Sequence, residues 1–167
     1  MARLRNTYLS RGKEFKPYGS FPPGFTLIID TREQLPLFDS RPKGLNIIHK
    51  SLKDGDYSIL GFEDKFTIER KMPSDFYTYL GQDRKKTISK MKRFKEFSYV
   101  ALVIEDSEDD IYFGNQFTSL TPDQIRAALV SFRIRYGVHV YFNNDRRMIE
   151  RFVLDHALKF YKMMREV

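Results

Sequence analysis

The segment "SYVALVIE", residues 98–105, constrains the fold of this 167-residue chain more than any other. Its apolar run is far too short to cross a bilayer and is typical of a buried strand. The run "FTLIID" at residues 25–30 has the same character, and polar residues stop it. Strands dominate the first part of the chain, and strands alternate with helical patterns later. This order predicts an α/β domain with a mixed sheet between helices.

Other segments fill in this outline. Further strands are expected at "GLNIIHKSL" (44–52), in a hairpin of "YSIL" and "KFTIERK" (57–71), and at "GVHVYF" (137–142). Helices are expected after Pro73, over the basic segment 84–95, from an N-cap at Thr121, and from Asp145 to the end. Residues 1–24 predict a basic, flexible arm that ends at "PPG", and residues 25–167 predict one folded domain.

Charge and composition narrow the classes of function. The net charge of +7 favours a polyanionic partner, with nucleic acid first. The absence of cysteine excludes disulfides, cysteine–zinc sites and thiol nucleophiles, and the three histidines show no metal-ligand spacing. The basic start lacks the apolar run of a secretory signal. We therefore expect an intracellular protein without a membrane partner, located in the cytoplasm or nucleoid of a bacterium or phage host, or in a eukaryotic nucleus.

An acid and a lysine alternate along the expected strand "FTIERK". Successive side chains of a strand point to opposite faces, so Glu69 and Lys71 share one face with Thr67, while Arg70 lies on the other. Asp56 ends a "DGD" turn before the preceding strand, and a hairpin would bring it near Glu69. Two carboxylates with waters suit Mg²⁺ or Mn²⁺ rather than zinc. A lysine beside them can orient a water or offset charge on a phosphate.

Neighbouring acids extend this candidate site, although each has a simpler explanation by itself. Asp30 ends the first strand, and with Glu33 it would enlarge the acidic pocket. Asp54 and Asp56 also fit plain turn residues, and charges on "ERK" also fit a solvated edge strand. Asp75 falls in the first turn of a helix, where a carboxylate stabilises the N-terminus without any catalytic role. The joint pattern, rather than any single residue, favours a site.

Three motifs together resemble the nuclease domain of the XPF family of structure-specific DNA endonucleases: "IIDTRE", "GDYSIL" and "IERKMPSDF". The signature of that family is GD, a variable gap, ERK, three residues and D, and this sequence carries it without departure. The later "GQDRKKTISKMKRF" and "YVALVIE" resemble the basic helix and next strand of the family. The resemblance implies a restriction-endonuclease-like fold and a Mg²⁺- or Mn²⁺-dependent phosphodiesterase.

The resemblance also implies a role for each motif residue. The metal ligands would be Asp56 and Glu69, with the upstream acid Asp30, and Lys71 would be the catalytic lysine. The residues expected to support catalysis are Glu33, Arg70 and Asp75. The basic segment after the motif is expected to contact DNA phosphates rather than serve only as a solvated helix face. Its expected DNA-binding residues are Arg84, Lys85, Lys86, Lys90, Lys92 and Arg93.

This sequence departs from the family in one feature that bears on the partners expected for the protein. Relatives usually carry a tandem helix-hairpin-helix domain after the nuclease, and this sequence has no such motif after its last expected helix. A preference for branched DNA and obligate dimerisation are therefore properties of the family rather than of these residues. The chain fits either a stand-alone nuclease or a domain of a longer protein, and its basic start and C-terminal helix favour the former.

The function expected from the sequence is metal-dependent endonucleolytic cleavage of branched, flapped or nicked DNA in repair or recombination. The protein would act alone, as a homodimer or as a nuclease-domain heterodimer. The alternative is a catalytically silent DNA-binding scaffold that pairs with an active nuclease. The intact motif argues against a scaffold, because a silent subunit has no physical need for clustered acids beside DNA. A general RNA- or polyanion-binding protein is a third reading, which competition between DNA and RNA duplexes would separate.

Overall fold

The computed structural model describes residues 15–114 and 118–166. Within them, the strands form one mixed sheet in the order β2-β1-β3-β4-β5-β6. The strands are β1 (Thr26–Ile29), β2 (Asn46–His49), β3 (Tyr57–Ile59), β4 (Phe66–Lys71), β5 (Tyr99–Ile104) and β6 (His139–Phe142). β3 runs antiparallel to both β1 and β4, and the other neighbours are parallel. The predicted mixed sheet and the β3–β4 hairpin are confirmed.

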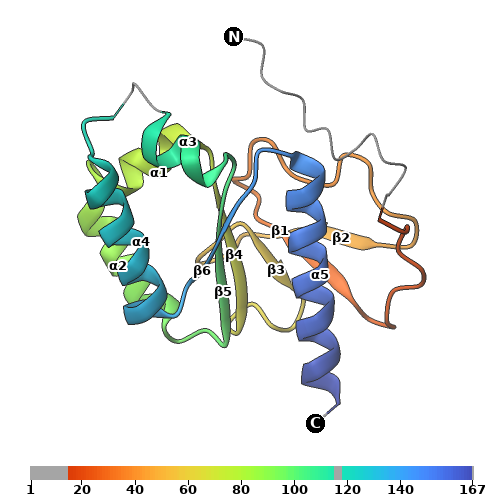
Figure 1. Cartoon of the computed structure of the whole chain (residues 1–167). Helices are drawn as coiled ribbons and strands as arrows, with labels where there is room; N and C mark the ends of the chain where they lie inside the picture. The colour runs from red at the N-terminus through yellow and green to blue at the C-terminus, as the bar shows by residue number, and fades with distance from the viewer. Residues whose placement is uncertain (1–14, 115–117, 167) are drawn as a thin grey trace, which may run out of the picture.

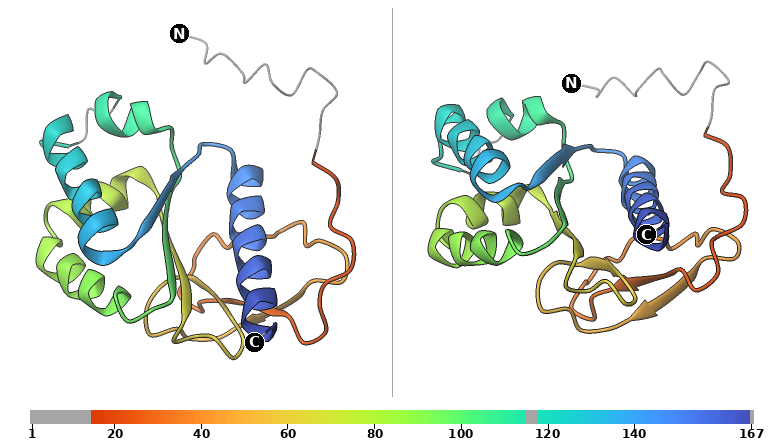
Figure 2. Two further views of the ribbon diagram at one scale, coloured as in Figure 1. Left: turned by 60° about the horizontal axis from the view of Figure 1, so that its bottom comes forward. Right: turned by 90° about the horizontal axis from the view of Figure 1, so that it is seen from below.

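Helices cover both faces of this sheet (Figures 1 and 2). One face carries α1 (Pro73–Leu80), α2 (Arg84–Phe94), α3 (Glu108–Phe113) and α4 (Pro122–Tyr136), and the opposite face carries α5 (Arg146–Arg165). Along β5, Ala101 and Val103 pack in the cluster under α5, whereas Leu102 and Ile104 pack in the cluster under α1–α4. Burial on both faces explains why "YVALVI" is apolar at every position.

Capping residues mark where several of the helices begin. Thr121 and Gln124 form a reciprocal capping box at the start of α4. Asp145 caps α5 by accepting a hydrogen bond from the Arg147 amide at 2.9 Å. The short helix α3 is absent from the helices expected above, and its signal is the capping serine Ser107, which accepts from the backbone N–H three residues later. The other helices begin where the sequence predicts them.

The predicted N-terminal arm is described only from residue 15, since residues 1–14 lie outside the described residues. The Tyr18 hydroxyl donates to Asp155 of α5 at 2.6 Å, and the guanidinium of Arg151 lies 4.2 Å from the centroid of the Tyr18 ring. Phe21 packs against the core under α5. Residues 15–24 therefore lie against α5, and the domain boundary at residue 24 stays a prediction.

No helix in the described ranges has the length and apolar content needed to span a membrane.

Candidate active site

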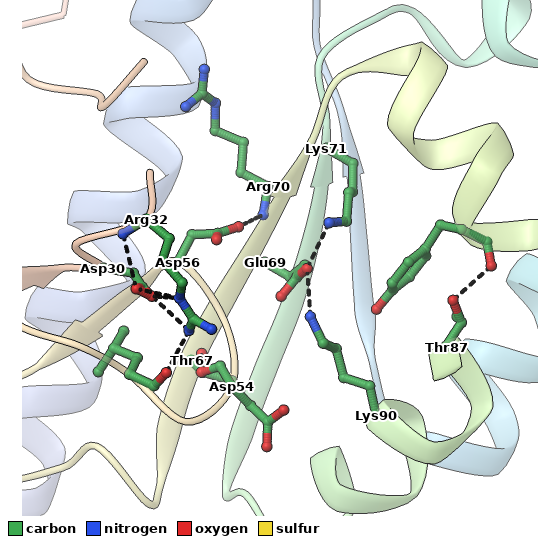
Figure 3. Close-up of polar contacts among 12 residues, drawn as sticks. Asp30, Arg32, Asp54, Asp56, Thr67, Glu69, Arg70, Lys71, Thr87 and Lys90 are labelled. Atoms are coloured by element: carbon green, nitrogen blue, oxygen red, sulfur yellow. Dashed lines mark hydrogen bonds and ion pairs between the residues drawn. The ribbon is translucent and has the colours of Figure 1, made fainter. Parts of the chain in front are cut away.

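The pairing of β1, β3 and β4 brings three of the predicted acids into one row. The Asp30 amide donates to the Asp56 carbonyl at 2.8 Å, and the Asp56 amide donates to the Ile68 carbonyl at 2.9 Å. This register places Glu69 next to Asp56 on the sheet face that carries α1 and α2 (Figure 3). Segments separated by up to 39 residues in the chain therefore meet because of strand register alone.

Gly55 makes the tight approach of the turn to β4 feasible. Its φ is +85°, and a Cβ there would lie 1.8 Å from the Thr67 hydroxyl oxygen. That hydroxyl donates to the Asp54 carbonyl at 3.0 Å and so closes the turn onto the strand. A side chain at position 55 would meet both backbone strain and a steric clash. The glycine of the "GD" motif thus fixes the position of Asp56.

Two lysines converge on Glu69 from different elements. Lys71 Nζ, from β4, and Lys90 Nζ, from α2, each lie 2.9 Å from Glu69 Oε1 (Figure 3). The Glu69 side chain is only 2% exposed, and its Oε2 is buried without a hydrogen-bond partner among the described residues. A buried carboxylate oxygen without a partner is costly, so this atom is suited to an additional ligand.

Asp56 lies in an unfavourable electrostatic environment for a carboxylate. It is half-buried, and its Oδ2 accepts a hydrogen bond from the Arg70 amide at 2.7 Å. Burial, followed by repulsion from Glu69, raises the pKa of Asp56 to about 7. Burial lowers the pKa of the Lys71 ammonium, but the nearby charges of Glu69, Asp56 and Asp75 outweigh burial and raise it. Asp75 itself is exposed in the first turn of α1.

Asp30, the third predicted metal ligand, is already paired. Its carboxylate accepts three hydrogen bonds from the Arg32 guanidinium, at 2.8–3.1 Å, and the same guanidinium also donates to the Leu52 carbonyl at 2.6 Å. Burial raises the pKa of Asp30, but these hydrogen bonds outweigh burial and lower it. The Asp30 charge is thus balanced by Arg32, and a role as metal ligand stays a prediction for this residue.

The acids that remain fit a divalent cation of the hard type. Within residues 15–114 and 118–166, no group of three or more histidine, cysteine, aspartate or glutamate side chains is arranged to hold a metal ion. Mg²⁺ usually retains several waters and binds through one or two carboxylates, so a pair is sufficient. Asp56 and Glu69 form such a pair, with one carboxylate of raised pKa and one unpartnered oxygen.

The other face of β4 carries a closed ionic cluster. The Arg70 guanidinium lies 3.1 Å from both Glu33 and Glu105 and donates to the Leu35 carbonyl at 2.6 Å. The Arg70 side chain is 5% exposed. Although Arg70 Nε and Glu33 Oε2 lack hydrogen bonds of good geometry, each lies in one of these ion pairs. Arg70 and Glu33 are thus brought together, but on the face opposite Glu69.

The basic helix α2 presents its charges in two directions. Lys90 and Arg93 point toward the sheet, and the Arg93 guanidinium pairs with the buried Asp54 at 2.6 Å. The exposed members of the predicted DNA-binding set are Arg84, Lys85, Lys86, Lys92 and Arg93, although Arg93 is also paired with Asp54. Lys86 lies 3.8 Å from Asp83. These residues form the exposed cationic surface of α2, the helix from which Lys90 reaches Glu69.

Four residues around the candidate site were not among the predicted site residues or have contacts that differ from their predicted role. Asp54 is an ion-pair partner rather than a simple turn residue, and Lys90 reaches Glu69. Glu105, which follows β5, closes the Arg70 cluster, and its position just past a strand end is the same signal that drew attention to Asp30. The Tyr79 ring lies 5.0 Å from Lys71 Nζ and 5.8 Å from Lys90 Nζ, and no local motif marks it.

Comparisons with known proteins agree with this architecture. A family model described as the ERCC4 domain matches residues 29–155. Among solved structures, XPF from Aeropyrum pernix in complex with DNA is similar with a TM-score of 0.63 and 21% identity, covering 83% of this chain and 66% of that chain. A second structure, XPF from Aeropyrum pernix, has a TM-score of 0.59 and 20% identity, covering 79% of this chain and 59% of that chain.

At these identities the structural likeness establishes the fold, and the chain spans two thirds or less of each solved relative. A search of curated proteins found no match. The family model covers most of the chain, from the last residue of β1 into α5. The chain therefore belongs to the ERCC4 domain family, a family of DNA nucleases, and has the fold of the XPF nuclease domain.

Proposed function

We propose that this protein is a Mg²⁺- or Mn²⁺-dependent DNA endonuclease whose active site is the Asp56–Glu69 pair with Lys71. The observation that carries the proposal is the buried Glu69 carboxylate. Lys71 Nζ lies 2.9 Å from one of its oxygens, and the other oxygen has no hydrogen-bond partner in the part of the chain that the structure describes. The exposed cations of α2 would hold the phosphate backbone without reading its bases. Branched, flapped or nicked duplex in repair or recombination is the proposed substrate.

The residues divide the chemistry between them. Asp56 and Glu69 would hold the cation, which when bound supplies a Lewis acid for the phosphate oxygens. Lys71 is fixed beside Glu69 and contributes positive charge where negative charge builds up on the phosphate. Attack by a water forms one P–O bond and breaks the ester P–O bond, which leaves a phosphate on one product and a hydroxyl on the other. Asp30, Glu33, Arg70 and Asp75 support the site from the surrounding structure.

The proposal is tested by cleavage of forked, flapped and nicked duplexes in the presence of Mg²⁺ or Mn²⁺. Wild type is expected to cut at least one of these substrates and to stop when the metal is chelated. Glu69→Gln and Lys71→Met are expected to lose about 10²-fold or more in rate while DNA binding is retained. Asp64→Asn, at an exposed acid in the β3–β4 turn, is the matched control and should cut normally.

Two results would contradict the proposal. The first is binding of every substrate by wild type without cutting, which would favour the scaffold function instead. The second is cleavage by Glu69→Gln at the wild-type rate. Formation of a homodimer, or of a heterodimer with a related nuclease domain, is tested in the same samples by measuring the molar mass of the protein with and without DNA.

A further inference from the structure

The contact of Lys90 with Glu69 adds a second cation to an oxygen that Lys71 already pairs. Lys71 already lies 2.9 Å from Glu69 Oε1, and Lys90 approaches the same oxygen at the same distance. The opposite oxygen, Oε2, has no hydrogen-bond partner among the described residues. Together with Asp56, the two lysines make the site electrically neutral when all four groups are ionised. A structural role would have been served better by one lysine for each oxygen.

Lys90 is held at the centre of a rigidly placed helix. Thr87, Lys90 and Arg93 follow one another at three-residue intervals on α2, and each contacts a different element. Thr87 donates to the Tyr79 carbonyl at 2.7 Å, and Arg93 pairs with Asp54 at 2.6 Å. These two contacts fix α2 at both ends of this stretch, so Lys90 is not needed to attach the helix. The Lys90 side chain is 25% exposed and can reach solvent without movement of the helix.

A divalent cation on Asp56 and Glu69 changes this balance. The neutral cluster would gain two positive charges within a largely buried site, and the ammonium of Lys90 would be repelled from it. A DNA phosphate lying on α2 offers Lys90 a negative partner outside the site. Lys86, which is exposed one turn before Lys90 on α2, would attract the same phosphate backbone.

We propose that Lys90 is a positioning residue that occupies Glu69 in the free protein and moves to a DNA phosphate when substrate binds, so that DNA and the divalent cation bind cooperatively. This inference rests on the proposed function. By linkage, whatever DNA adds to metal affinity, metal adds equally to DNA affinity. Cleavage of DNA would then require both ligands together, and the free protein would hold the cation weakly.

The test is a titration with Mn²⁺ alone, in which free Mn²⁺ is measured by electron paramagnetic resonance, with and without a short linear duplex. Without DNA, Lys90→Met is expected to bind Mn²⁺ about tenfold more tightly than wild type, because a cation beside the ligand oxygen is removed. Lys159→Met, which removes the same charge from an exposed position on α5 on the opposite face of the sheet, is expected to match wild type. Lys90→Arg keeps a cation there and is expected to stay near wild type.

Adding the duplex is expected to tighten Mn²⁺ binding clearly in wild type and in Lys159→Met. In Lys90→Met the fold-change on adding the duplex is expected to be less than half of the wild-type fold-change. Equal Mn²⁺ affinity of wild type and Lys90→Met without DNA would overturn the inference while leaving the proposed nuclease intact. Failure of wild type to bind Mn²⁺ under either condition would instead contradict the proposed function itself. Circular dichroism of each variant confirms that the fold is retained.

Discussion

The two faces of β4 carry charged clusters of opposite design. On one face, the Arg70 guanidinium is nearly buried, forms ion pairs with two carboxylates and donates a hydrogen bond to a carbonyl. Because its charge is already balanced, it is not suited to bind a further ligand. On the other, Glu69 has two lysines on one oxygen and none on the second, beside an aspartate whose pKa is raised. Consecutive residues of one motif thus form a closed ion-pair cluster on one face and the proposed active site on the other.

Arg70→Met should give the largest stability change in this comparison. It would leave Glu33 and Glu105 without their cation in a buried cluster, at a cost of about 3–5 kcal/mol in the free energy of unfolding. Urea unfolding in the absence of metal measures this. Arg126→Met removes an exposed arginine that pairs with Asp123, and it should cost less than about 1 kcal/mol. Equal losses in the free energy of unfolding for the two variants would contradict a stabilising role of the Arg70 cluster.

Gly55→Ala should lower the free energy of unfolding by about 2–3 kcal/mol. The added Cβ would clash with the Thr67 hydroxyl, and alanine is strained at the positive φ of this position. Gly61→Ala is the matched control, because Gly61 has φ +88° but no atom within 4 Å of an added Cβ. That control should show only the backbone strain, about 1 kcal/mol. Thermal unfolding of both variants separates the clash from the strain, and equal losses would mean that the turn does not press on β4.

Asp56→Asn should stabilise the metal-free protein. The folded pKa of Asp56, about 7, lies above the ordinary value of 3.8, so the folded state binds more protons than the unfolded state between these values. Stability of wild type should therefore fall as pH rises from about 4 to 7, and the variant should lose part of this slope. Because the side chain is half-buried, we expect a gain of about 1–2 kcal/mol at pH 8. Asp64→Asn should show no such gain in the same urea titrations.

Asp75→Asn should have the smallest effect. The carboxylate is exposed in the first turn of α1, so its loss should cost about 0.3–1 kcal/mol through the helix dipole. It also adds to the negative charge around Lys71, so we expect cleavage to fall by less than about tenfold. Parallel unfolding and cleavage measurements separate the two roles. A loss as deep as that of Glu69→Gln would place Asp75 in the active site itself.

Much of this comparison could be predicted from local sequence. The alternation of side chains along "FTIERK" assigns Glu69 and Lys71 to one face and Arg70 to the other, and the structure agrees. The turn chemistry of "DGD" likewise placed Asp56 near Glu69. These predictions succeed because side-chain alternation is a local property of a strand, and because a hairpin pairs two strands that follow one another in the chain.

The partners of these residues could not be predicted in the same way. Lys90 reaches Glu69, and Arg93 reaches Asp54, only through the packing of α2 against the sheet, which no local pattern specifies. Arg32 pairs with Asp30 through a two-residue spacing that also fits an open loop. Glu105 joins Arg70 because β5 lies beside β4, so its role depends on sheet order rather than on its own neighbours in the chain.

Anomalous scattering from crystals soaked in Mn²⁺ shows whether Asp56 and Glu69 together bind a divalent cation. We expect one anomalous peak about 2.2 Å from an oxygen of each carboxylate, with water completing the coordination, and no such peak in Glu69→Gln crystals. A wild-type crystal that shows no peak between these two side chains, or a peak bound elsewhere while DNA is still cut, would contradict this expectation.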